Sequence, residues 1–479
     1  MMNVAPKFCK NYESLLDNHF ESILKDKHLS IPGLVVLAKR GDEVYHKAFG
    51  VSDLKSEKAM QTDSMFRMYS MTKVLTSFIA LRLYEEELFE LDDPVSQFIP
   101  SFDRAWDIVV DCPEGPESID YKSILTGESQ NLNFRRKIST EPMLIKHLMS
   151  ESAGIEYEIF SEYDSLFGGG VCDRNAGLVA NALRQQLHPQ VYRSSSILGA
   201  DITLQEFVDT IGNAGVLTCE PGEFSYGHGA TVLGRIIEIL YEKSRGEFKK
   251  LSEIMSALLF EPLEMEDAAF FLEDGDHRVK RIPTLYGALL NSDGVTTKVA
   301  EEQDCYPEGT KYLTNQTAHF SGSRLYESGD TGAIMTASDY SKFYDMLLDG
   351  GVSKKGERVL SEQGVRTLCK GRFTNLRLNT ALAKSFGVAG ADSPFPKSFN
   401  FGWATAHGDQ NVLKGYKNGD HFDMSHWGGY ALTQGIFYPT EKSYMLVCPQ
   451  MMSTTPGAFA FGQPLVRDKS MSVFQSVWR

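Results

Sequence analysis

SMTK at residues 70–73 places a serine one helical turn before a lysine, and it is the most informative stretch of this chain. Residues 63–69 read as an extended lead-in, and residues 74–83 have the apolar spacing of a helix. Residues i and i+3 share one face of a helix, so the Lys73 amine can reach the Ser70 hydroxyl. A helix start also offers outward-pointing N–H groups and a dipole that favours negative charge. This pattern indicates an activated nucleophile with support for the oxyanion it produces.

The S-x-x-K pattern is weak evidence by itself, because two further copies occur at residues 22–25 and 52–55. The first copy lies near the end of an expected amphipathic helix, and the second lies in a polar loop after an expected strand. Only Ser70 opens a helix that is apolar enough to be buried. The alternative interpretation of Ser70 is an ordinary helix N-cap.

The composition of the 479-residue chain favours a globular protein, since 42% of its residues are hydrophobic. The formal net charge is −15 and no basic stripe is interleaved with aromatics, so we expect no nucleic-acid binding. No run of 18 or more apolar residues occurs, so we expect no membrane span. The first ten residues lack signal-peptide features, and seven scattered cysteines form no C-x-x-C pair. Together these features predict a cytoplasmic protein with reduced thiols.

The two ends of the chain are expected to form one sheet. Residues 31–38 and 43–51 read as two strands joined by a turn, and residues 435–438 and 443–449 form a similar pair near the other end. An amphipathic helix precedes the first pair, and an amphipathic segment at 465–478 follows the second. The simplest arrangement is an antiparallel sheet with a helix from each end packed on it.

The middle of the chain gives mainly helical signals. Two stretches in it, 101–139 and 273–328, read as long loops, which are usually functional or mobile. The clear helices are expected at residues 70–87, 143–150, 204–211 and 229–242.

These elements predict an α/β (α+β) fold with two domains. Residues 1–69 and 321–479 would form a discontinuous sheet domain, and residues 70–320 would form a mainly helical inserted domain. Pockets are common between two such domains, so we expect the active site there.

A tyrosine stands at the entrance of the expected helix at 229–242. A turn at residues 221–225 precedes Tyr226, which is followed by Gly227 and His228. A tyrosine placed there could serve as a general base or proton relay if a nearby lysine ammonium lowered its pKa. Taken alone, a half-buried tyrosine with a satisfied hydroxyl is the commoner interpretation.

Two adjacent glycines, Gly428 and Gly429, lie between Trp427 and Tyr430, just before the C-terminal hairpin. Glycines in a strand often mark the close approach of a ligand or of another backbone. A strand N–H beyond them could serve as a second oxyanion donor, paired with the N–H of Ser70. A tight turn or bulge is the alternative interpretation.

Together, S-x-x-K at 70, Y-x-H at 226 and W-G-G at 427 resemble the motifs of the serine β-lactamase and penicillin-binding-protein superfamily. The resemblance is to its class C-like branch, which includes the family VIII carboxylesterases. Residues 145–155, IKHLMSESAGI, are similar to the family's I-x-H-L-L-T-H-T-S-G-L. Residues 336–351 are similar to its T-A-x-D-x-x-x-F-x-x-M-L-L-x-G-G. The resemblance covers roughly residues 30–450 and implies a β-lactamase/transpeptidase-like fold.

The resemblance also implies a role for each matching residue. Ser70 would attack an acyl carbonyl, while Lys73 and Tyr226 would share general-base and proton-relay duty in an order that the sequence leaves open. The backbone N–H groups of Ser70 and Tyr430 would form the oxyanion hole. The substrate-binding residues would be His228, Trp427, Gly428 and Gly429.

Two departures from the family pattern bear on the substrate. His228 stands where many class C-like enzymes have asparagine, so the hydrogen bonding that orients the lysine and the substrate would differ, and an imidazole there could titrate near neutral pH. The WGG sequence at 427–429 stands where β-lactamases and peptidases carry K-[ST]-G, whose lysine helps to hold a substrate carboxylate. Its absence favours uncharged esters. A near match, KNG at 417–419, lies in a turn-rich segment and reads as a loop.

Motifs for other chemistry are missing from the sequence. It contains no G-x-S-x-G, P-loop, Rossmann fingerprint, H-E-x-x-H or EF-hand loop. His421, Asp423 and His426 do not have the spacing of a standard metal site. We therefore expect neither a metal nor a cofactor.

The sequence thus predicts a cytoplasmic serine hydrolase that acts through an acyl-enzyme on small ester or lactone substrates. Acyl transfer to an alcohol or amine is an alternative on the same site, and a non-catalytic self-assembling scaffold is a second. A D-amino-acid amidase, a peptidase or a β-lactamase is disfavoured by the W-G-G motif. The expected partner is a small-molecule acyl substrate, and a homo-oligomer is left open.

Overall fold

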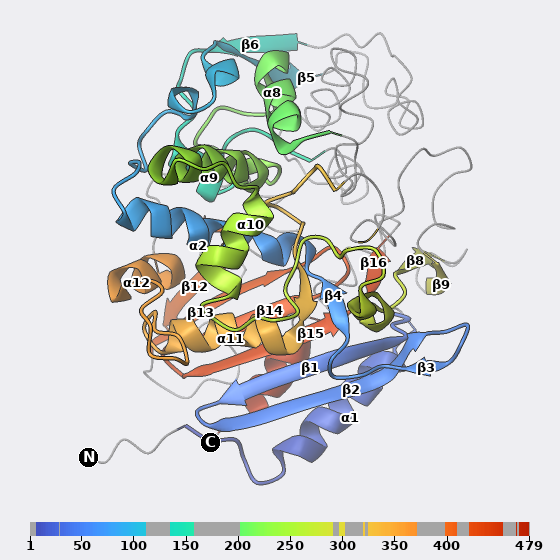
Figure 1. The fold of residues 1–479 in the computed structure, drawn as a ribbon. Helices are drawn as coiled ribbons and strands as arrows, with labels where there is room; N and C mark the ends of the chain where they lie inside the picture. The colour runs from blue at the N-terminus through green and yellow to red at the C-terminus, as the bar shows by residue number, and fades with distance from the viewer. Residues whose placement is uncertain are drawn as a thin grey trace.

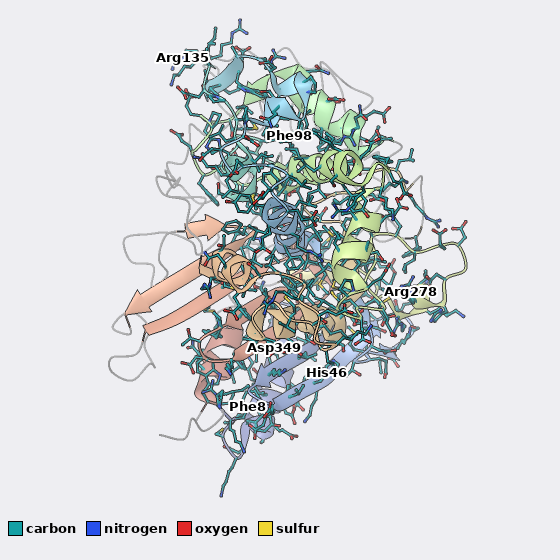
Figure 2. The ribbon with its side chains drawn as sticks, turned by 60° about the vertical axis from the view of Figure 1, so that its left-hand side comes forward. Phe8, His46, Phe98, Arg135, Arg278 and Asp349 are labelled. Carbon is teal, nitrogen blue, oxygen red and sulfur yellow. The ribbon has the colours of Figure 1, made fainter. Side chains whose placement is uncertain are left out.

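A computed structural model of the protein describes residues 6–27, 29–111, 135–157, 202–290, 297–301, 320, 324–370, 398–409, 421–453, 466 and 469–478. A large sheet occupies the lower half of Figure 1, and a mainly helical region that contains α2, α9 and α8 lies above it. Phe8 and Arg135 mark opposite ends of the molecule (Figure 2).

The two ends of the chain meet in the sheet at β1 (Gly33–Arg40). This strand pairs antiparallel with β2 (Glu43–Asp53) on one side and with β15 (Ser443–Pro449) on the other. Nearly all of its residues are buried, as expected for an apolar strand covered on both faces. The prediction of one sheet built from both termini is therefore confirmed. The strand order is β11-β12-β13-β14-β15-β1-β2-β3, in which the remaining strands are β3 (Lys58–Ala59), β11 (Ser398–Asn400), β12 (Trp403–Asp409), β13 (His421–Gly428) and β14 (Gln434–Tyr438).

Helices from both termini pack on one face of this sheet. Phe20 of α1 (Tyr12–Leu24) and Phe474 of the helical residues 469–476 share a buried cluster with Val36 of β1. The two segments lie together beneath the sheet in Figure 1. The predicted pairing of a helix from each end with the sheet is confirmed.

The opposite face of the sheet packs against the main core, with α11 lying on β1 and β15. Val35 and Leu37 of β1 join the main core, to which α2 (Thr72–Glu85), α9 (Gly229–Arg245) and α11 (Ala337–Leu348) also contribute. Almost every residue of α2 is buried, so this helix lies at the centre of the molecule. Among the helices of the described residues, none is both long and apolar enough to cross a membrane. The other helices are α4 (Ile145–Met149), α8 (Leu204–Ala214), α10 (Leu251–Met255) and α12 (Glu362–Lys370).

The four helices expected from the sequence are all present, with shifted ends. The helix expected from residue 70 begins at Thr72, after the 3₁₀ turn η1 (Tyr69–Met71). Helix α8 begins at a capping box in which the Thr203 hydroxyl accepts a hydrogen bond from the Glu206 N–H at 3.1 Å. The remaining short turns are η2 (Val95–Gln97), η3 (Pro100–Phe102), η5 (Ser256–Phe260, a π-helical turn) and η6 (His277–Arg281).

The expectation of a long loop at 101–139 is wrong for its two ends. The first end forms β5 (Trp106–Asp111), which pairs antiparallel with β6 (Arg135–Ser139) and parallel with β7 (Val216–Leu217). The sequence hides this sheet because β6 is almost entirely exposed and carries no apolar alternation.

The loop expected at 273–328 also contains strands. β8 (Tyr286–Leu290) pairs antiparallel with β9 (Thr297–Glu301) and parallel with β16 (Met451–Ser453). The partner of β8 lies far away in the sequence, so local patterns cannot reveal it. The proposed domain boundary at 320 remains a prediction, and this sheet joins segments from both sides of it.

The end of β13 packs directly on the turn that carries Ser70. Gly429 follows β13, and a Cβ atom at this position would overlap the carbonyl oxygen of Met68 and the hydroxyl of Thr433. The Gly429 N–H donates to the Thr433 carbonyl at 2.8 Å. This glycine therefore permits a close backbone contact that fixes the sheet against η1.

Gly429→Ala is expected to lower the free energy of unfolding by about 1–3 kcal/mol, because the added methyl group overpacks a rigid backbone contact. Urea denaturation monitored by tryptophan fluorescence measures this change. An unfolding midpoint equal to that of the wild type would contradict the packing described for this residue.

Candidate active site

Ser70 lies in η1, where the backbone is strained. Tyr69, the preceding residue, has a φ of +46°, a left-handed conformation that is uncommon for a residue with a side chain. The Tyr340 hydroxyl donates to the Met71 carbonyl at 3.0 Å and ties the end of the turn to α11. Within the buried run 64–81, Ser70 alone is partly exposed. The fold therefore presents this hydroxyl at the surface of a rigid core.

Lys73 lies in the first turn of α2 and is completely buried. Its ammonium group donates a 2.6 Å hydrogen bond to the Tyr157 hydroxyl and lies 3.5 Å from a carboxylate oxygen of Asp330. It also lies 4.8 Å from the centre of the Tyr226 ring. Burial alone would lower the pKa of Lys73, but the charge of Asp330, with smaller contributions from Tyr226 and Glu151, raises it. Lys73 is therefore an ammonium ion at neutral pH.

Tyr226 contacts Trp427 and interacts with Ser70. Its hydroxyl accepts a 2.9 Å hydrogen bond from the Trp427 indole N–H, and the interaction with the Ser70 side chain is among the influences that lower its pKa. Burial raises the pKa of Tyr226, and this effect outweighs the opposing influence of Lys73, Ser70 and Trp427. The structure thus brings together the serine, lysine and tyrosine expected from the sequence. The lysine does oppose the rise in the tyrosine pKa, as expected for a general base, but the complete burial of Tyr226 outweighs it.

The turn that contains Tyr226 is held in place by backbone contacts with residues 155–157. Gly227 forms an antiparallel bridge with Glu156, and a Cβ atom on Gly227 would overlap the carbonyl oxygen of Ile155. The His228 N–H donates to the same carbonyl at 2.8 Å. Only glycine fits between Tyr226 and His228, so the spacing of Y-G-H follows from this close backbone contact.

His228 lies behind the lysine, at the start of α9. Its side chain is about 3% exposed, and its Nδ1 atom lies 3.3 Å from a carboxylate oxygen of Asp330. Its ring meets the rings of Tyr157 and Phe207 edge to face, with centroids 4.5 and 5.1 Å apart. His228 is therefore positioned to support Asp330, and its role in binding substrate remains a prediction.

Three buried or half-buried residues of this site were not predicted from the sequence: Glu151, Tyr157 and Asp330. Glu151 has a left-handed backbone, with φ +49°, and its carboxyl group accepts a 2.8 Å hydrogen bond from the Gly227 N–H. Burial, together with the charge of Asp330, raises the pKa of Glu151 to about 8. The one available signal for Glu151 was an acidic residue inside the otherwise uncharged stretch 148–155.

The segment at 427–430 forms the opposite edge of the site. The ring of Tyr430 meets that of Tyr69, beside Ser70, edge to face at 6.1 Å. Gly429 is explained by its contact with Met68, which is the backbone approach expected as one alternative for the paired glycines. The oxyanion hole assigned to the N–H groups of Ser70 and Tyr430 remains a prediction.

Some expected features fall outside the described part of the chain. These are KNG at 417–419 and the side chains of His421 and Asp423. Within the described residues, no group of three or more His, Cys, Asp or Glu side chains is arranged to hold a metal ion.

Two curated proteins illustrate the similarity of this chain to known enzymes. Esterase EstB of Burkholderia gladioli is 25% identical over 257 residues, which make up 53% of this chain and 50% of the relative. ML-236A carboxylate methylbutanoyltransferase mlcH of Penicillium citrinum is 25% identical over 264 residues, again 53% of this chain and 50% of the relative. The chain thus spans about half the length of these two relatives.

Two solved structures show the same fold. EstCE1, described as a hydrolase with promiscuous acyltransferase activity, has a TM-score of 0.61 at 20% identity, covering 96% of this chain and 98% of its own. The unliganded selenomethionyl form of simvastatin synthase, LovD, from Aspergillus terreus has a TM-score of 0.65 at 17% identity, with 97% and 98% of the two chains covered. The model of the beta-lactamase family matches residues 16–460. Since that match spans nearly the whole sequence, the chain belongs to the beta-lactamase family.

Proposed function

We propose that the protein is a serine hydrolase that acts through an acyl-enzyme on small, uncharged ester or lactone substrates. The observation that carries this proposal is the grouping of the partly exposed Ser70 with Tyr226 and the buried Lys73, whose ammonium lies 4.8 Å from the centre of the tyrosine ring. A serine hydroxyl needs a base to become an effective nucleophile, and the neighbouring Tyr226 is the side chain that would serve as this base.

The protonation of the site sets the first step. Lys73 and Tyr226 both have raised pKa values, so both hold their protons in the resting site. Ser70 can pass its proton to Tyr226 only after this pair has lost one proton to solvent. The attack of Ser70 on the acyl carbonyl then leaves the Tyr226 phenol to protonate the departing alcohol, and water repeats the sequence in reverse. Turnover should therefore rise with pH.

Two backbone N–H groups would stabilise the tetrahedral intermediate. We assign them to Ser70 and Tyr430, whose elements are held together by the contact of Gly429 with Met68 and by the rings of Tyr69 and Tyr430. Donors fixed in this way need no reorganisation as negative charge develops on the substrate oxygen.

The residues at the sheet edge favour an uncharged substrate. Trp427 stands where related β-lactamases and peptidases carry a lysine, and its indole N–H is directed at Tyr226. A substrate carboxylate would thus lose the partner that it has in those enzymes. The name of Esterase EstB, a relative in the same family, agrees with ester substrates.

Acyl transfer to an alcohol or amine is the second candidate function, because the same acyl-enzyme can react with either acceptor. Two similar proteins carry this activity in their names: the methylbutanoyltransferase mlcH and EstCE1, a hydrolase with promiscuous acyltransferase activity. A cytoplasmic location and a homo-oligomeric state also remain proposals, the first supported by cysteines scattered without C-x-x-C pairs.

Wild-type protein is expected to hydrolyse p-nitrophenyl acetate and butyrate, and Ser70→Ala should abolish this turnover because it removes the nucleophile. Tyr226→Phe should lower kcat by about 10²–10⁴-fold, since it removes the proton acceptor. Steady-state assays with acetate, butyrate and octanoate esters measure these effects, and the chain-length profile sizes the pocket.

Nitrocefin and a fluorophosphonate probe serve as controls for this assay. Slow or absent nitrocefin cleavage is expected, together with fluorophosphonate labelling that depends on Ser70. Equal ester turnover by wild type and Ser70→Ala would contradict the proposal. The absence of both turnover and labelling would also contradict it and would favour the scaffold alternative.

The raised pKa of Glu151 predicts a pH-dependent stability. Its carboxyl group is protonated in the folded protein up to about pH 8, whereas the unfolded chain releases this proton near pH 4.3. The contribution of Glu151 is therefore fully present at low pH and is lost as the pH rises toward 8. Glu151→Gln should show a smaller loss of unfolding free energy between pH 5 and pH 8 than the wild type. Urea denaturation between pH 5 and pH 8 measures this loss. An equal dependence of the unfolding free energy on pH in both proteins would contradict the raised pKa of Glu151.

A further inference from the structure

A buried carboxylate, Asp330, lies behind the reactive serine and is not accounted for by the mechanism above. It is fully buried and lies at the N-terminus of α9, where His228 makes no capping hydrogen bond with its side chain. Asp330 supplies that acceptor instead, because its carboxylate accepts hydrogen bonds from the Thr231 N–H at 3.0 Å and the Thr231 hydroxyl at 2.6 Å. The positive end of the helix dipole therefore stabilises its negative charge.

Asp330 faces the ammonium group of Lys73 at 3.5 Å. Both side chains are completely shielded from solvent, so each charge would be strongly disfavoured without the other. Burial opposes ionisation of Asp330, but Lys73, His228 and Thr231 together lower its pKa. The carboxylate is thus a fixed negative charge beneath the lysine.

The other ionisable groups around this pair are Glu151, Tyr157, Tyr226 and His228. Glu151 has a pKa of about 8 and is neutral at pH 7, so Asp330 is the carboxylate that balances the ammonium ion there. The Tyr157 side chain is uncharged, since burial raises its pKa well above the usual value. Among Lys73, Asp330, Glu151 and the two tyrosines, the charged groups are therefore the Lys73 ammonium and the Asp330 carboxylate, with the tyrosine hydroxyls and the Glu151 carboxyl group protonated around them.

We propose that Asp330 is a positioning residue for the acyl-transfer reaction: held by Thr231 and His228, its carboxylate keeps Lys73 charged and fixed in place, so that Tyr226 acts as the base. This inference rests on the proposed function of Ser70. When the pair of Lys73 and Tyr226 loses its proton, Asp330 retains the proton on the lysine and leaves the negative charge on the tyrosine oxygen, next to Ser70. In this step Tyr226 gives up its hydroxyl proton and the solvent takes it up, while Lys73 and Asp330 keep their charges.

Asp330→Asn is the direct test, because the amide keeps the size of the side chain and removes its charge. Without the carboxylate, the Lys73 ammonium loses its proton more easily. The first proton is then lost from Lys73 and not from Tyr226. The rising limb of kcat/KM against pH should therefore move to lower pH, by about one to three units. The plateau should fall by about ten- to a hundredfold, because the base is no longer Tyr226 and the lysine is no longer held in place.

Asp339→Asn is the matched control. Asp339 is also buried at the start of a helix, in α11, and is paired with Lys342 at 2.8 Å, outside the site. The Asp339→Asn variant should leave both the rising limb and the plateau of kcat/KM against pH unchanged. A structural disturbance of Asp330→Asn would lower the plateau without moving the limb.

Thr231→Val provides a second variant if Asp330→Asn does not fold. It removes the hydroxyl donor to Asp330 and preserves the shape of the side chain, so the limb should shift in the same direction by a smaller amount. Thr231→Ser retains a hydroxyl donor and should shift the limb less than Thr231→Val.

The outcomes separate this proposal from the proposed function. Ser70-dependent turnover in the wild type, with a limb that does not move in Asp330→Asn or, if that variant is unfolded, in Thr231→Val, would overturn the role of Asp330 and leave the hydrolase intact. Wild-type protein without Ser70-dependent turnover or fluorophosphonate labelling would overturn both. A limb that moves to lower pH with a reduced plateau supports the proposal.

Discussion

The ion pair between Lys73 and Asp330 is the interaction on which the rest of the site depends. A lysine that is completely shielded from water would ordinarily lose its charge, since desolvation penalises the ammonium form. The Asp330 carboxylate lies 3.5 Å from the Lys73 ammonium and keeps it charged. The Thr231 N–H in the first turn of α9 stabilises this carboxylate in turn. The pair therefore joins α2, which follows the nucleophile, to α9, which follows Tyr226. The chemistry of the site and the packing of its two central helices share one contact.

Close backbone contacts hold the remaining parts in place. Gly429 brings the sheet edge against Met68, and Gly227 lets the tyrosine turn pass the carbonyl of Ile155. A third glycine, Gly402, has a left-handed φ of +82° and lies against the backbone of Lys73. A side chain at any of these positions would displace a backbone segment that carries a site residue. The positions of Ser70 and Tyr226 are thus set by backbone packing as much as by their own side-chain hydrogen bonds.

Much of this arrangement could be predicted from the sequence, for identifiable reasons. The spacing of Ser70 and Lys73, the turn before Tyr226 and the Trp427 motif are local signals, and resemblance to a family gave them roles. Asp330 has no such signal and Glu151 has only its place in an uncharged stretch, because an acidic residue in a loop usually faces water and only the tertiary fold buries these two. The raised pKa of Tyr226 likewise has no local signal, since its burial is a property of the packed site. Likewise, β8 pairs with β16, a distant strand that no local pattern indicates.

The proposed mechanism requires Ser70 to carry the acyl group during turnover. Mass spectrometry of protein quenched within milliseconds of mixing with p-nitrophenyl butyrate would detect this intermediate. We expect a mass increase of one butyryl group on the peptide that contains Ser70, present in the wild type and absent in Ser70→Ala. Butyrylation of a different residue, or ester turnover with no acylated protein and no effect of Ser70→Ala, would contradict it.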